Sequence, residues 1–321
     1  MNIGVLCDRI EDAAEYAYEP QSPKTDCARM KKIPLIVVVG PTASGKSEYA
    51  LKKARELGGE IISGDSMQIY RKMDIGTAKP SAEEMKEIPH HLIDVADISE
   101  VFSAARFVEL ASSAIKDIYS RGKMPIIAGG TGLYIETLIS GTELSATEDD
   151  PKLREELFAF AEEKGALALH ERLREVDPES ADAIHPNNIK RVARALEIFI
   201  KTGETKTEAD KKSRLRESIY DPYVVYIRPK ERETLYQRID LRVDKMFDMG
   251  LEEEVRVLYE KGLESTPTAS QAIGYKEFYS YFKGETDIES VKQAICLNTR
   301  HYAKRQMTWF NRTQPNEIIE I

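Results

Sequence analysis

The chain has 321 residues, of which 41% are hydrophobic and 31% are charged, and its formal net charge at pH 7 is −9. A chain of this length can bury a sizeable core, so we expect a main domain with an insertion or a second domain. No apolar run reaches the roughly 18 residues that a membrane-spanning helix needs. The cysteines Cys7, Cys27 and Cys296 are too few and too scattered for a disulfide framework or a zinc cluster. The composition therefore argues against membrane-spanning and disulfide-rich proteins and favours a reducing cytoplasm.

Residues 1–30 form an acidic extension that we expect to be weakly ordered, with three basic and six acidic side chains. Asp8, Arg9 and Glu11 interrupt the apolar core that a signal peptide would need. Met30, directly before two lysines, is an alternative first residue. The rest of the chain is expected to contain a core segment at 31–144, a helical insertion at 145–216, and a return to the core with C-terminal helices at 217–321.

The first predicted strand, residues 35–39, leads into a glycine loop and then into a predicted helix at 48–57. The loop has the spacing G-x-x-x-x-G-K-S, which in this context predicts a P-loop, the phosphate-binding loop of nucleotide- and ATP-binding proteins. Backbone N–H groups, the helix N-terminus and the Lys46 ammonium would converge on an oligophosphate, with Ser47 in the usual place of a magnesium ligand. The predicted phosphate-binding residues are Gly40, Pro41, Thr42, Ala43, Ser44, Gly45, Lys46 and Ser47. The motif predicts a phosphate site but does not fix the reaction.

A second predicted strand, residues 60–63, ends just before Asp65 and Ser66. Ligands bind at the carboxyl ends of the strands in an open parallel sheet, so both side chains are expected beside the P-loop. An equally good interpretation is that Asp65 only caps the helix that follows.

Two adjacent histidines, His90 and His91, come next in the chain. Adjacent side chains on a strand face opposite ways, and neither a cysteine nor a third histidine is near in sequence, so we do not expect a metal site here. A helix is predicted from residue 102 onward, with apolar side chains at Val108, Ala111 and Ile115.

A third strand, starting near Met124, ends in Ala128, Gly129 and Gly130. ATP-hydrolysing P-loop proteins usually place a magnesium-binding Asp at such a strand end, and its absence weakens an ATPase interpretation. The glycines beside Thr131 suggest that backbone approaches a flat or bulky ligand. A simple packing turn is the alternative.

Residues 145–216 are highly charged and helical in pattern, without a strand signal. Asp150 followed by proline is a plain helix start. Between residues 190 and 216 there are nine basic and four acidic side chains, and residues 300–312 carry four basic side chains and no acidic one. Two basic patches on an acidic protein suit a partner bound along one face, although solvated helix faces without a partner explain the charge at least as well.

The chain is expected to rejoin the sheet with a strand at 223–227, followed by helices at 231–249, 251–259 and 288–310. Arg238 and Arg242 lie one helical turn apart and could grip a diphosphate, or could pair with neighbouring acidic side chains. Trp309 is better explained as a core anchor than as a platform for a base.

Several ordered motifs now carry a specific resemblance that spans roughly residues 33–312. They are GPTASGKS at 40–47, DSMQIY at 65–70, MDIGTAKP at 73–80, HHLID at 90–94, FSAARF at 102–107, GGTGLY at 129–134 and TRHYAKRQMTWF at 299–310. This set resembles the tRNA dimethylallyltransferase family, in its bacterial form without a C-terminal zinc finger. The family transfers a dimethylallyl group from dimethylallyl diphosphate to the adenine on the 3′ side of the anticodon. The resemblance implies an α/β fold with a P-loop parallel sheet, an inserted helical domain and a helical C-terminal region.

The resemblance also implies roles for individual residues. The P-loop would hold the diphosphate of the donor, with Mg²⁺ at Ser47, rather than hydrolyse ATP. Asp65 would be the general base for the exocyclic amine of adenine, and Thr131 would hydrogen-bond near that amine. The leaving diphosphate would be bound by arginines, for which the candidates are Arg228, Arg232 and Arg238. The tRNA contacts would come from Asp65, Ser66, Met67, Gln68, Thr131, Arg154, Lys190, Arg191, Val192, Ala193 and Arg194.

Three other functions remain open at this level: an adenylate isopentenyltransferase, a small-molecule P-loop kinase and a noncatalytic RNA-binding protein. A kinase would explain the P-loop but not the basic insertion, and an RNA-binding protein would not explain Asp65 beside an intact P-loop. The expected partners are the anticodon stem-loop of tRNA and dimethylallyl diphosphate, with no membrane and with a monomeric enzyme.

Overall fold

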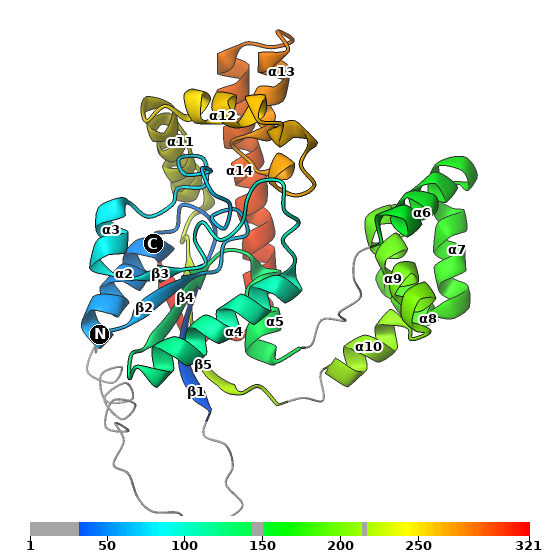
Figure 1. The fold of residues 1–321 in the computed structure, drawn as a ribbon, viewed down its shortest axis with the longest axis horizontal. Helices are drawn as coiled ribbons and strands as arrows, with labels where there is room; N and C mark the ends of the chain where they lie inside the picture. The colour runs from blue at the N-terminus through cyan, green and yellow to red at the C-terminus, as the bar shows by residue number, and fades with distance from the viewer. Residues whose placement is uncertain (1–31, 143–149, 214–216) are drawn as a thin grey trace, which may run out of the picture. The chain divides into compact units, whose positions relative to one another are not determined.

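The computed structural model describes residues 32–142, 150–213 and 217–321, so the expectations for residues 1–30 lie outside the described part. The described chain divides into two compact units (Figure 1). The core unit contains residues 32–139 and 219–321, and the inserted unit is Ser140–Ser218. The sequence analysis placed the insertion at 145–216, slightly inside these limits.

A six-stranded sheet forms the centre of the core unit, with strand order β3-β2-β4-β1-β5-β6. All neighbouring strands are parallel. The strands are β1 (Ile33–Val39), β2 (Glu60–Ser63), β3 (His90–His91), β4 (Pro125–Gly129), β5 (Tyr220–Arg228) and β6 (Glu317–Glu320). The α/β fold with a parallel sheet, predicted from the sequence, is confirmed. The short edge strand β6 was not foreseen, because four residues with alternating exposure give little signal.

Helices occupy most of the remaining chain. In the core unit they are α2 (Lys46–Leu57), α3 (Ala82–Glu87), α4 (Ala104–Ser120), α5 (Gly132–Ser140), α11 (Arg232–Asp248), α12 (Leu251–Glu260), α13 (Tyr279–Phe282) and α14 (Ile288–Phe310). Three short 3₁₀ turns lie at Leu263–Ser265, Ala269–Gln271 and Lys276–Phe278. The inserted unit contains α6 (Pro151–Lys164), α7 (Ala166–Val176), α8 (Pro178–Ala183), α9 (Ile189–Thr202) and α10 (Lys206–Ser213).

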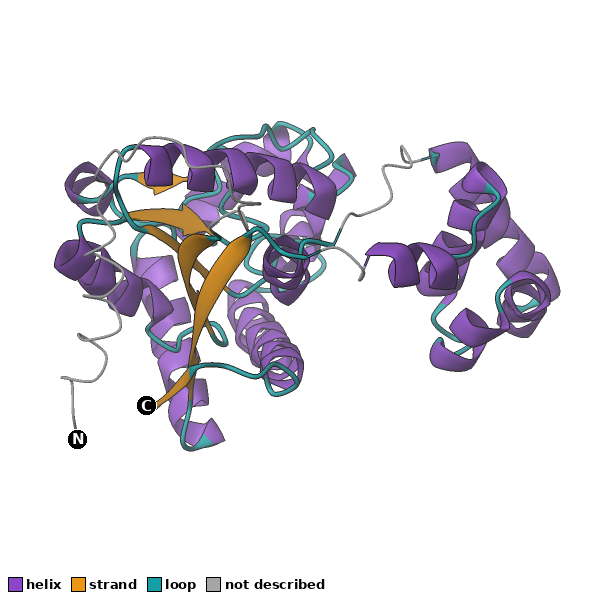
Figure 2. Ribbon diagram, turned by 90° about the horizontal axis from the view of Figure 1, so that it is seen from below, coloured by secondary structure: helices purple, strands orange, loops and turns teal. Residues whose placement is uncertain are grey.

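The apolar run of β1 is buried on both faces of the sheet, as expected for an inner parallel strand. Leu35, Val37 and Val39 pack in a cluster with α4, α5, α11 and α14, whereas Ile36 and Val38 pack with α2. Figure 2 shows these helices on either side of the strands. The two hydrophobic layers fix the sheet between helices and hold the carboxyl ends of β1, β2 and β4 at one edge.

Local signals explain several element boundaries. Asp150 caps α6 by accepting a hydrogen bond from the backbone N–H of Leu153 at 3.1 Å, which confirms the predicted helix start. Trp309 packs against the main core, and a Cβ added at Gly132 would overlap its indole ring. Trp309 is therefore a core anchor, as the sequence suggested.

A buried carboxylate ties β2 to the neighbouring β3 and to the turn before β4. Glu60, whose side chain is 2% exposed, accepts hydrogen bonds from Arg121 at 2.6 and 2.7 Å and from Lys123 at 2.8 Å. His91 Nε2 lies 2.8 Å from the same carboxylate, so this histidine has a structural partner. The hydrogen bonds from Arg121, and then those from Lys123 and His91, hold the pKa of Glu60 below its usual range.

Replacing Glu60 with glutamine is expected to lower the free energy of unfolding at pH 7 by about 1–2 kcal/mol, because charge-assisted hydrogen bonds are lost. The effect is modest since Arg121 and Lys123 are 39% and 44% exposed and stay partly solvated. A carboxyl with a depressed folded pKa stabilises the fold above its unfolded pKa and loses this contribution as the pH falls through the folded value. Urea unfolding at pH 7 and pH 3 measures it: the difference in stability between the wild-type and Glu60→Gln proteins should be smaller at pH 3, because the contribution is lost progressively below the unfolded pKa. A constant difference would contradict the ionic origin.

Among the described residues, no helix combines the length and apolar character needed to cross a membrane. Those residues also contain no group of three or more His, Cys, Asp or Glu side chains arranged to hold a metal ion.

Candidate functional site

The ends of three adjacent strands bring the predicted site residues to one edge of the sheet. Val39, the last residue of β1, pairs with Gly129 of β4, and Ser63 of β2 pairs with Ala128. The segments that follow these strands are the glycine loop (residues 40–47), the turn at Asp65 and the turn at Thr131. This edge is where ligands bind in open parallel sheets.

The glycine loop opens directly into α2. Gly45 has a φ of 83°, a left-handed conformation that suits glycine, and it is the N-cap of the helix. Lys46 Nζ donates a hydrogen bond to the carbonyl oxygen of Pro41 at 2.6 Å, whereas Ser47 is exposed in the first turn. The loop therefore presents the helix N-terminus and one ammonium group to the same space.

Asp65 both caps a turn and faces a cavity. Its Oδ1 accepts a hydrogen bond from the backbone N–H of Met67 at 2.8 Å, and the N–H of Gln68 lies at 3.4 Å from the same oxygen. Asp65 also lines a partly apolar cavity at this edge. Asp65 thus has the expected position beside the glycine loop. The alternative that it caps a following helix is wrong, because its oxygen caps a turn and the next helix, α3, begins only at Ala82.

Thr131 and Gln68 fix the surroundings of Asp65. Thr131 Oγ1 accepts a hydrogen bond from the N–H of Ser66 at 3.0 Å. Gln68 Nε2 donates to the carbonyl oxygens of Thr77 and Ala78, and its Oε1 accepts from Ser63. The side chain of Gln68 is thus engaged in holding the loop after β2.

The cavity beside Asp65 has a volume of about 250 Å³. It receives side chains from the strand ends, α11, α14 and the segment 271–276. Its lining residues are Thr42, Asp65, Ser66, Met67, Gly76, Thr77, Ile239, Arg242, Val243, Met246, Gln271, Ala272, Ile273, Gly274, Lys276, Ile295, Thr299, Tyr302 and Arg305. A lining that combines apolar side chains with polar and charged ones suits a ligand with a small apolar part and a charged part.

Lys46 and Arg242 interact electrostatically with each other and with Asp65. Burial and, to a smaller extent, the charge of Arg242 lower the pKa of Lys46 to about 7, although the carboxylate of Asp65 acts in the opposite direction. Burial also lowers the pKa of Arg242, again against the attraction of Asp65. The site therefore holds more positive charge than its one carboxylate balances, which is the electrostatic condition for binding an anion.

Arg242, Tyr302 and Arg305 were not among the residues selected from the sequence. Arg242 was considered beside Arg238, and only the structure separates them: Arg242 lines the cavity, whereas Arg238 is exposed and lines neither this cavity nor the one described next. Burial raises the pKa of Tyr302, and the charge of Asp65 raises it further. The signal available in the sequence was the one-turn spacing on α11 and the basic motif in α14.

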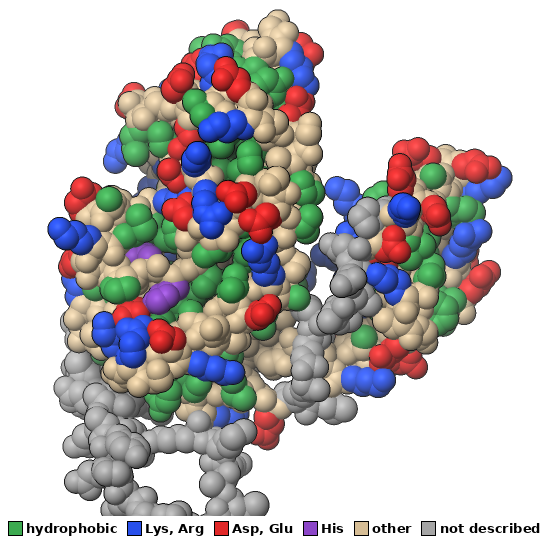
Figure 3. Space-filling view, in the orientation of Figure 1, with side chains coloured by type: hydrophobic (Ala, Val, Ile, Leu, Met, Phe, Trp, Pro, Cys, Tyr) green, Lys and Arg blue, Asp and Glu red, His purple; other side chains and the backbone are tan. Residues whose placement is uncertain are grey.

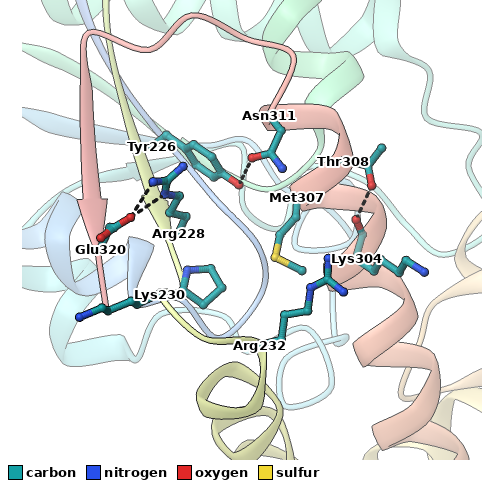
Figure 4. A pocket seen from close by; sticks show the side chains of 10 residues that line it. Tyr226, Arg228, Lys230, Arg232, Lys304, Met307, Thr308, Asn311 and Glu320 are labelled. Carbon is teal, nitrogen blue, oxygen red and sulfur yellow. Dashed lines mark hydrogen bonds and ion pairs between the residues drawn. The ribbon is translucent and has the colours of Figure 1, made fainter.

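A second cavity, of about 300 Å³, lies between the end of β5 and α14. Figure 4 shows Arg228, Lys230, Arg232 and Lys304 around it, with Met307 on α14. Arg228 is paired with Glu320 of β6 at 2.6 Å. Two of the arginines selected for the leaving diphosphate, Arg228 and Arg232, thus lie together at the end of β5. This strand pairs with β1, which is followed by the glycine loop.

The inserted unit was expected to contact tRNA through residues 190–194 and Arg154. Lys190 and Arg191 are exposed on α9, but Val192 and Ala193 are 0% and 1% exposed and form part of the hydrophobic core of this unit. The side chains of Val192 and Ala193 pack α9 against α6 and α7, so any contact of these two residues with tRNA would have to come from their backbone.

Arg154 and Arg194 both pair with the fully buried carboxylate of Glu197, at 2.9 and 2.8 Å. Hydrogen bonds from both arginines help to hold the pKa of Glu197 below its usual range, against the effect of burial. Figure 3 shows basic and acidic side chains interspersed over the face of this unit that it draws. On this face the positive charge is consequently distributed in small groups rather than over one uniform surface.

The two glycines at the end of β4, Gly129 and Gly130, serve packing. A Cβ added at Gly129 would overlap the backbone of Gly64, and one added at Gly130 would overlap the side-chain amide of Gln306. These contacts favour the alternative of a close-packed turn over the suggestion that the glycines let the backbone approach a flat ligand.

Comparisons with known proteins identify the family of the chain. A family model described as IPP transferase matches residues 68–313, more than half of the chain. The tRNA dimethylallyltransferase of Lachnoclostridium phytofermentans is 46% identical over 88% of this chain and 90% of its own length. That of Bacillus cytotoxicus is 49% identical over 86% of each.

Solved structures give the same result. A tRNA isopentenylpyrophosphate transferase from Bacillus halodurans is 44% identical, matches with a TM-score of 0.66 and is covered, like this chain, over 90% of its length. A eukaryotic dimethylallyltransferase acting on tRNA is 33% identical and matches with a TM-score of 0.75, over 86% of this chain and 69% of its own. The chain therefore belongs to the tRNA dimethylallyltransferase family.

Proposed function

We propose that the protein transfers a dimethylallyl group from dimethylallyl diphosphate to the exocyclic amine of the adenine on the 3′ side of the anticodon in tRNA. The observation that carries this proposal is the placement of Asp65 and Arg242 on one partly apolar cavity, with Lys46 in electrostatic interaction with both. A carboxylate beside an anion-binding loop can serve a reaction in which a proton leaves one substrate and a diphosphate leaves the other.

The donor end of the site is the P-loop, residues 40–47. Backbone N–H groups at the start of α2, together with Lys46 and Arg242, bind the diphosphate, and the apolar walls accept the five-carbon group. Arg228 and Arg232, beside the second cavity, are further candidates for the departing diphosphate. Positive charge at these positions stabilises the negative charge that develops on the leaving group.

In the transfer step, the exocyclic nitrogen forms a bond to C1 of the dimethylallyl group while the bond between C1 and the diphosphate oxygen breaks. The electron pair of that bond leaves with the diphosphate, and the amine proton passes to a carboxylate oxygen of Asp65. The amine becomes acidic only as the new bond forms, so an ordinary carboxylate is a competent base. The Thr131 hydroxyl, which accepts a hydrogen bond from the Ser66 N–H, would hydrogen-bond near the same amine.

Mg²⁺ fits this site as an ion carried by the substrate. Its preferred partners are oxygens, with phosphates and water often supplying most of them. The exposed Ser47 hydroxyl at the start of α2 is a suitable single protein ligand. A bound Mg²⁺ would neutralise part of the diphosphate charge, while Lys46 and Arg242 do so from the protein side.

The acceptor base has to leave the stack of the anticodon loop to enter the cavity, which is easier in a loop than in a duplex. Residues 65–68 then lie next to the flanking nucleotides, and Lys190, Arg191 and Arg194 offer phosphate contacts on the inserted unit. With tRNA as acceptor, we expect a monomeric enzyme that works in the cytoplasm without a membrane partner.

The deciding measurement is transfer of radiolabelled dimethylallyl from its diphosphate to unmodified tRNA with Mg²⁺, run beside free AMP as acceptor and beside an ATP-only reaction. Label in tRNA alone is the expected result. Label in AMP would make the protein an adenylate isopentenyltransferase, and ATP consumption without label would make it a small-molecule kinase. Because the P-loop binds the donor diphosphate, ATP should act at most as a competitor.

The pKa of Lys46 leads to a second expectation. In the protein without tRNA or donor, the Lys46 side chain, with a pKa of about 7, is mostly uncharged at pH 8. A bound diphosphate raises this pKa, because its negative charge favours the ammonium form. Donor binding should therefore take up close to one proton and weaken as the pH rises above 7, by up to about tenfold per pH unit. Calorimetric titrations in buffers of different ionisation enthalpy measure the uptake. Lys46→Met should abolish it, and an unchanged uptake in that variant would assign the proton to another group.

A further inference from the structure

We infer that Gln306 is a positioning residue, which fixes the distance between the donor-binding loop and the acceptor-binding residues. This inference rests on the proposed function. Gln306 lies in the last turns of α14 and is 5% exposed, although its side chain is polar. A buried amide in a hydrophobic layer is retained only where its hydrogen bonds are made.

Both ends of this amide are bonded, each to a different part of the site. Oε1 accepts a hydrogen bond from the backbone N–H of Thr42, in the middle of the glycine loop, at 2.8 Å. Nε2 donates to the carbonyl oxygen of Gly130, in the turn after β4, at 3.0 Å. One side chain from α14 thus bridges the loops that follow β1 and β4.

The bridge continues to the acceptor side. Gly130 precedes Thr131, whose hydroxyl accepts from the N–H of Ser66, which follows Asp65. The backbone N–H of Thr131 also donates to the carbonyl oxygen of Gly64 at 3.2 Å. The position of the general base is consequently connected to that of the diphosphate loop through Gln306.

Glutamine has the chemistry that this place requires. One atom has to accept a hydrogen bond and its neighbour has to donate one, which only an amide does at this length. Gly130 is matched to it, because a Cβ there would overlap Nε2 of Gln306. No positive φ is recorded at Gly130, so the clash with Gln306 is the main obstacle to alanine at this position.

The role predicts a loss in the chemical step rather than in binding. A shift of about 1 Å between reacting groups can cost about 100-fold in rate. In Gln306→Met, which keeps length and volume, the single-turnover rate at saturating donor and tRNA should fall by about 10-fold to 100-fold. The dissociation constants for dimethylallyl diphosphate and for tRNA should stay within about 3-fold of the wild type, since Lys46, Arg242 and the RNA-facing side chains remain. Gln293→Met, an exposed glutamine on the same helix, is the matched control and should leave the rate unchanged.

A double-variant cycle separates this role from general loss of structure. Gly130→Ala should be strongly impaired while Gln306 is present, and Gln306→Ala should be impaired by itself. The double variant should be no slower than Gln306→Ala, because the clash and the bridge involve the same contact. Gln306→Glu should be as slow as Gln306→Met, because a carboxylate accepts from Thr42 but cannot donate to Gly130.

Two results would overturn the inference. One is a wild-type rate in Gln306→Met and Gln306→Glu. The other is a loss of rate in the double variant that equals the product of the losses in Gly130→Ala and Gln306→Ala. Weakened binding of both substrates together with a lower melting temperature would also overturn it, since that pattern belongs to a structural role. Absence of transfer by the wild-type protein and by Gln293→Met is a different outcome, because it overturns the proposed function itself.

Discussion

Asp65→Asn is expected to lower the single-turnover rate of dimethylallyl transfer by about 10²-fold to 10⁴-fold, the usual contribution of a general base. The substitution removes the proton acceptor but keeps the turn, because the amide oxygen still accepts from the backbone N–H of Met67. Binding of tRNA and of the donor should therefore remain close to wild type. The measurement is a rapid-quench assay with enzyme in excess, combined with filter binding of labelled tRNA.

The control for this variant is Asp97→Asn, which removes a carboxylate paired with Arg71 on the surface. It should transfer at the wild-type rate. If Asp65→Asn also transferred at that rate, the base would have to be sought elsewhere; if it lost tRNA binding in parallel, Asp65 would act in recognition. Asp65→Ala should show the same loss in rate, with an added loss of stability from the broken cap.

Arg242→Met is expected to have the second large effect, by weakening donor binding. The structure places Arg242 at the cavity beside Lys46 and Asp65, where a charged group and a bound diphosphate would both be shielded from water. Truncating one member of a desolvated charge pair typically costs about 2–5 kcal/mol. The dissociation constant for dimethylallyl diphosphate should therefore rise by roughly 30-fold to a few thousand-fold, with unchanged affinity for tRNA.

Arg238→Met provides the matched comparison, one helical turn away on the same helix. Its side chain is exposed, so its removal should change donor affinity by less than about 3-fold. Calorimetric titration of both variants with dimethylallyl diphosphate in the absence of tRNA measures the difference. Equal losses in the two variants would contradict the assignment of Arg242, and a larger loss in Arg238→Met would restore the arginine chosen from the sequence.

The parallel sheet and most of its elements could be predicted because their signals are local. The run at β1 is apolar on both faces, the glycine spacing marks the loop, and Asp150 caps a helix that begins in proline. The inserted unit was recognisable from its loss of strand pattern. β6 could not be foreseen, because an edge strand of four residues is defined by its pairing with β5 rather than by its composition.

The candidate site was predictable only where one motif contains the whole signal. Asp65 and the glycine loop follow strands, so their positions derive from topology. Arg242 and Arg238 have the same local pattern, and only the packing of α11 decides which one faces the cavity. Gln306 was hidden in a basic segment, since its two hydrogen-bond partners are distant in sequence. Val192 and Ala193 show another limit of the sequence: the segment 190–194 was considered as a contact surface, and only the structure shows that two of its side chains belong to the core.

The pairing of β1 with β5 has a consequence for synthesis of the protein. Ile33 pairs with Tyr220, and the whole inserted unit lies between these two strands in the chain. The edge of β1 that pairs with β5 therefore stays unpaired until most of the polypeptide has left the ribosome. An open strand edge invites pairing with other chains. The inserted unit has its own hydrophobic core and can fold during this interval. Its folding makes the segment between β1 and β5 compact, so that β5 can pair with the edge of β1 that is still open.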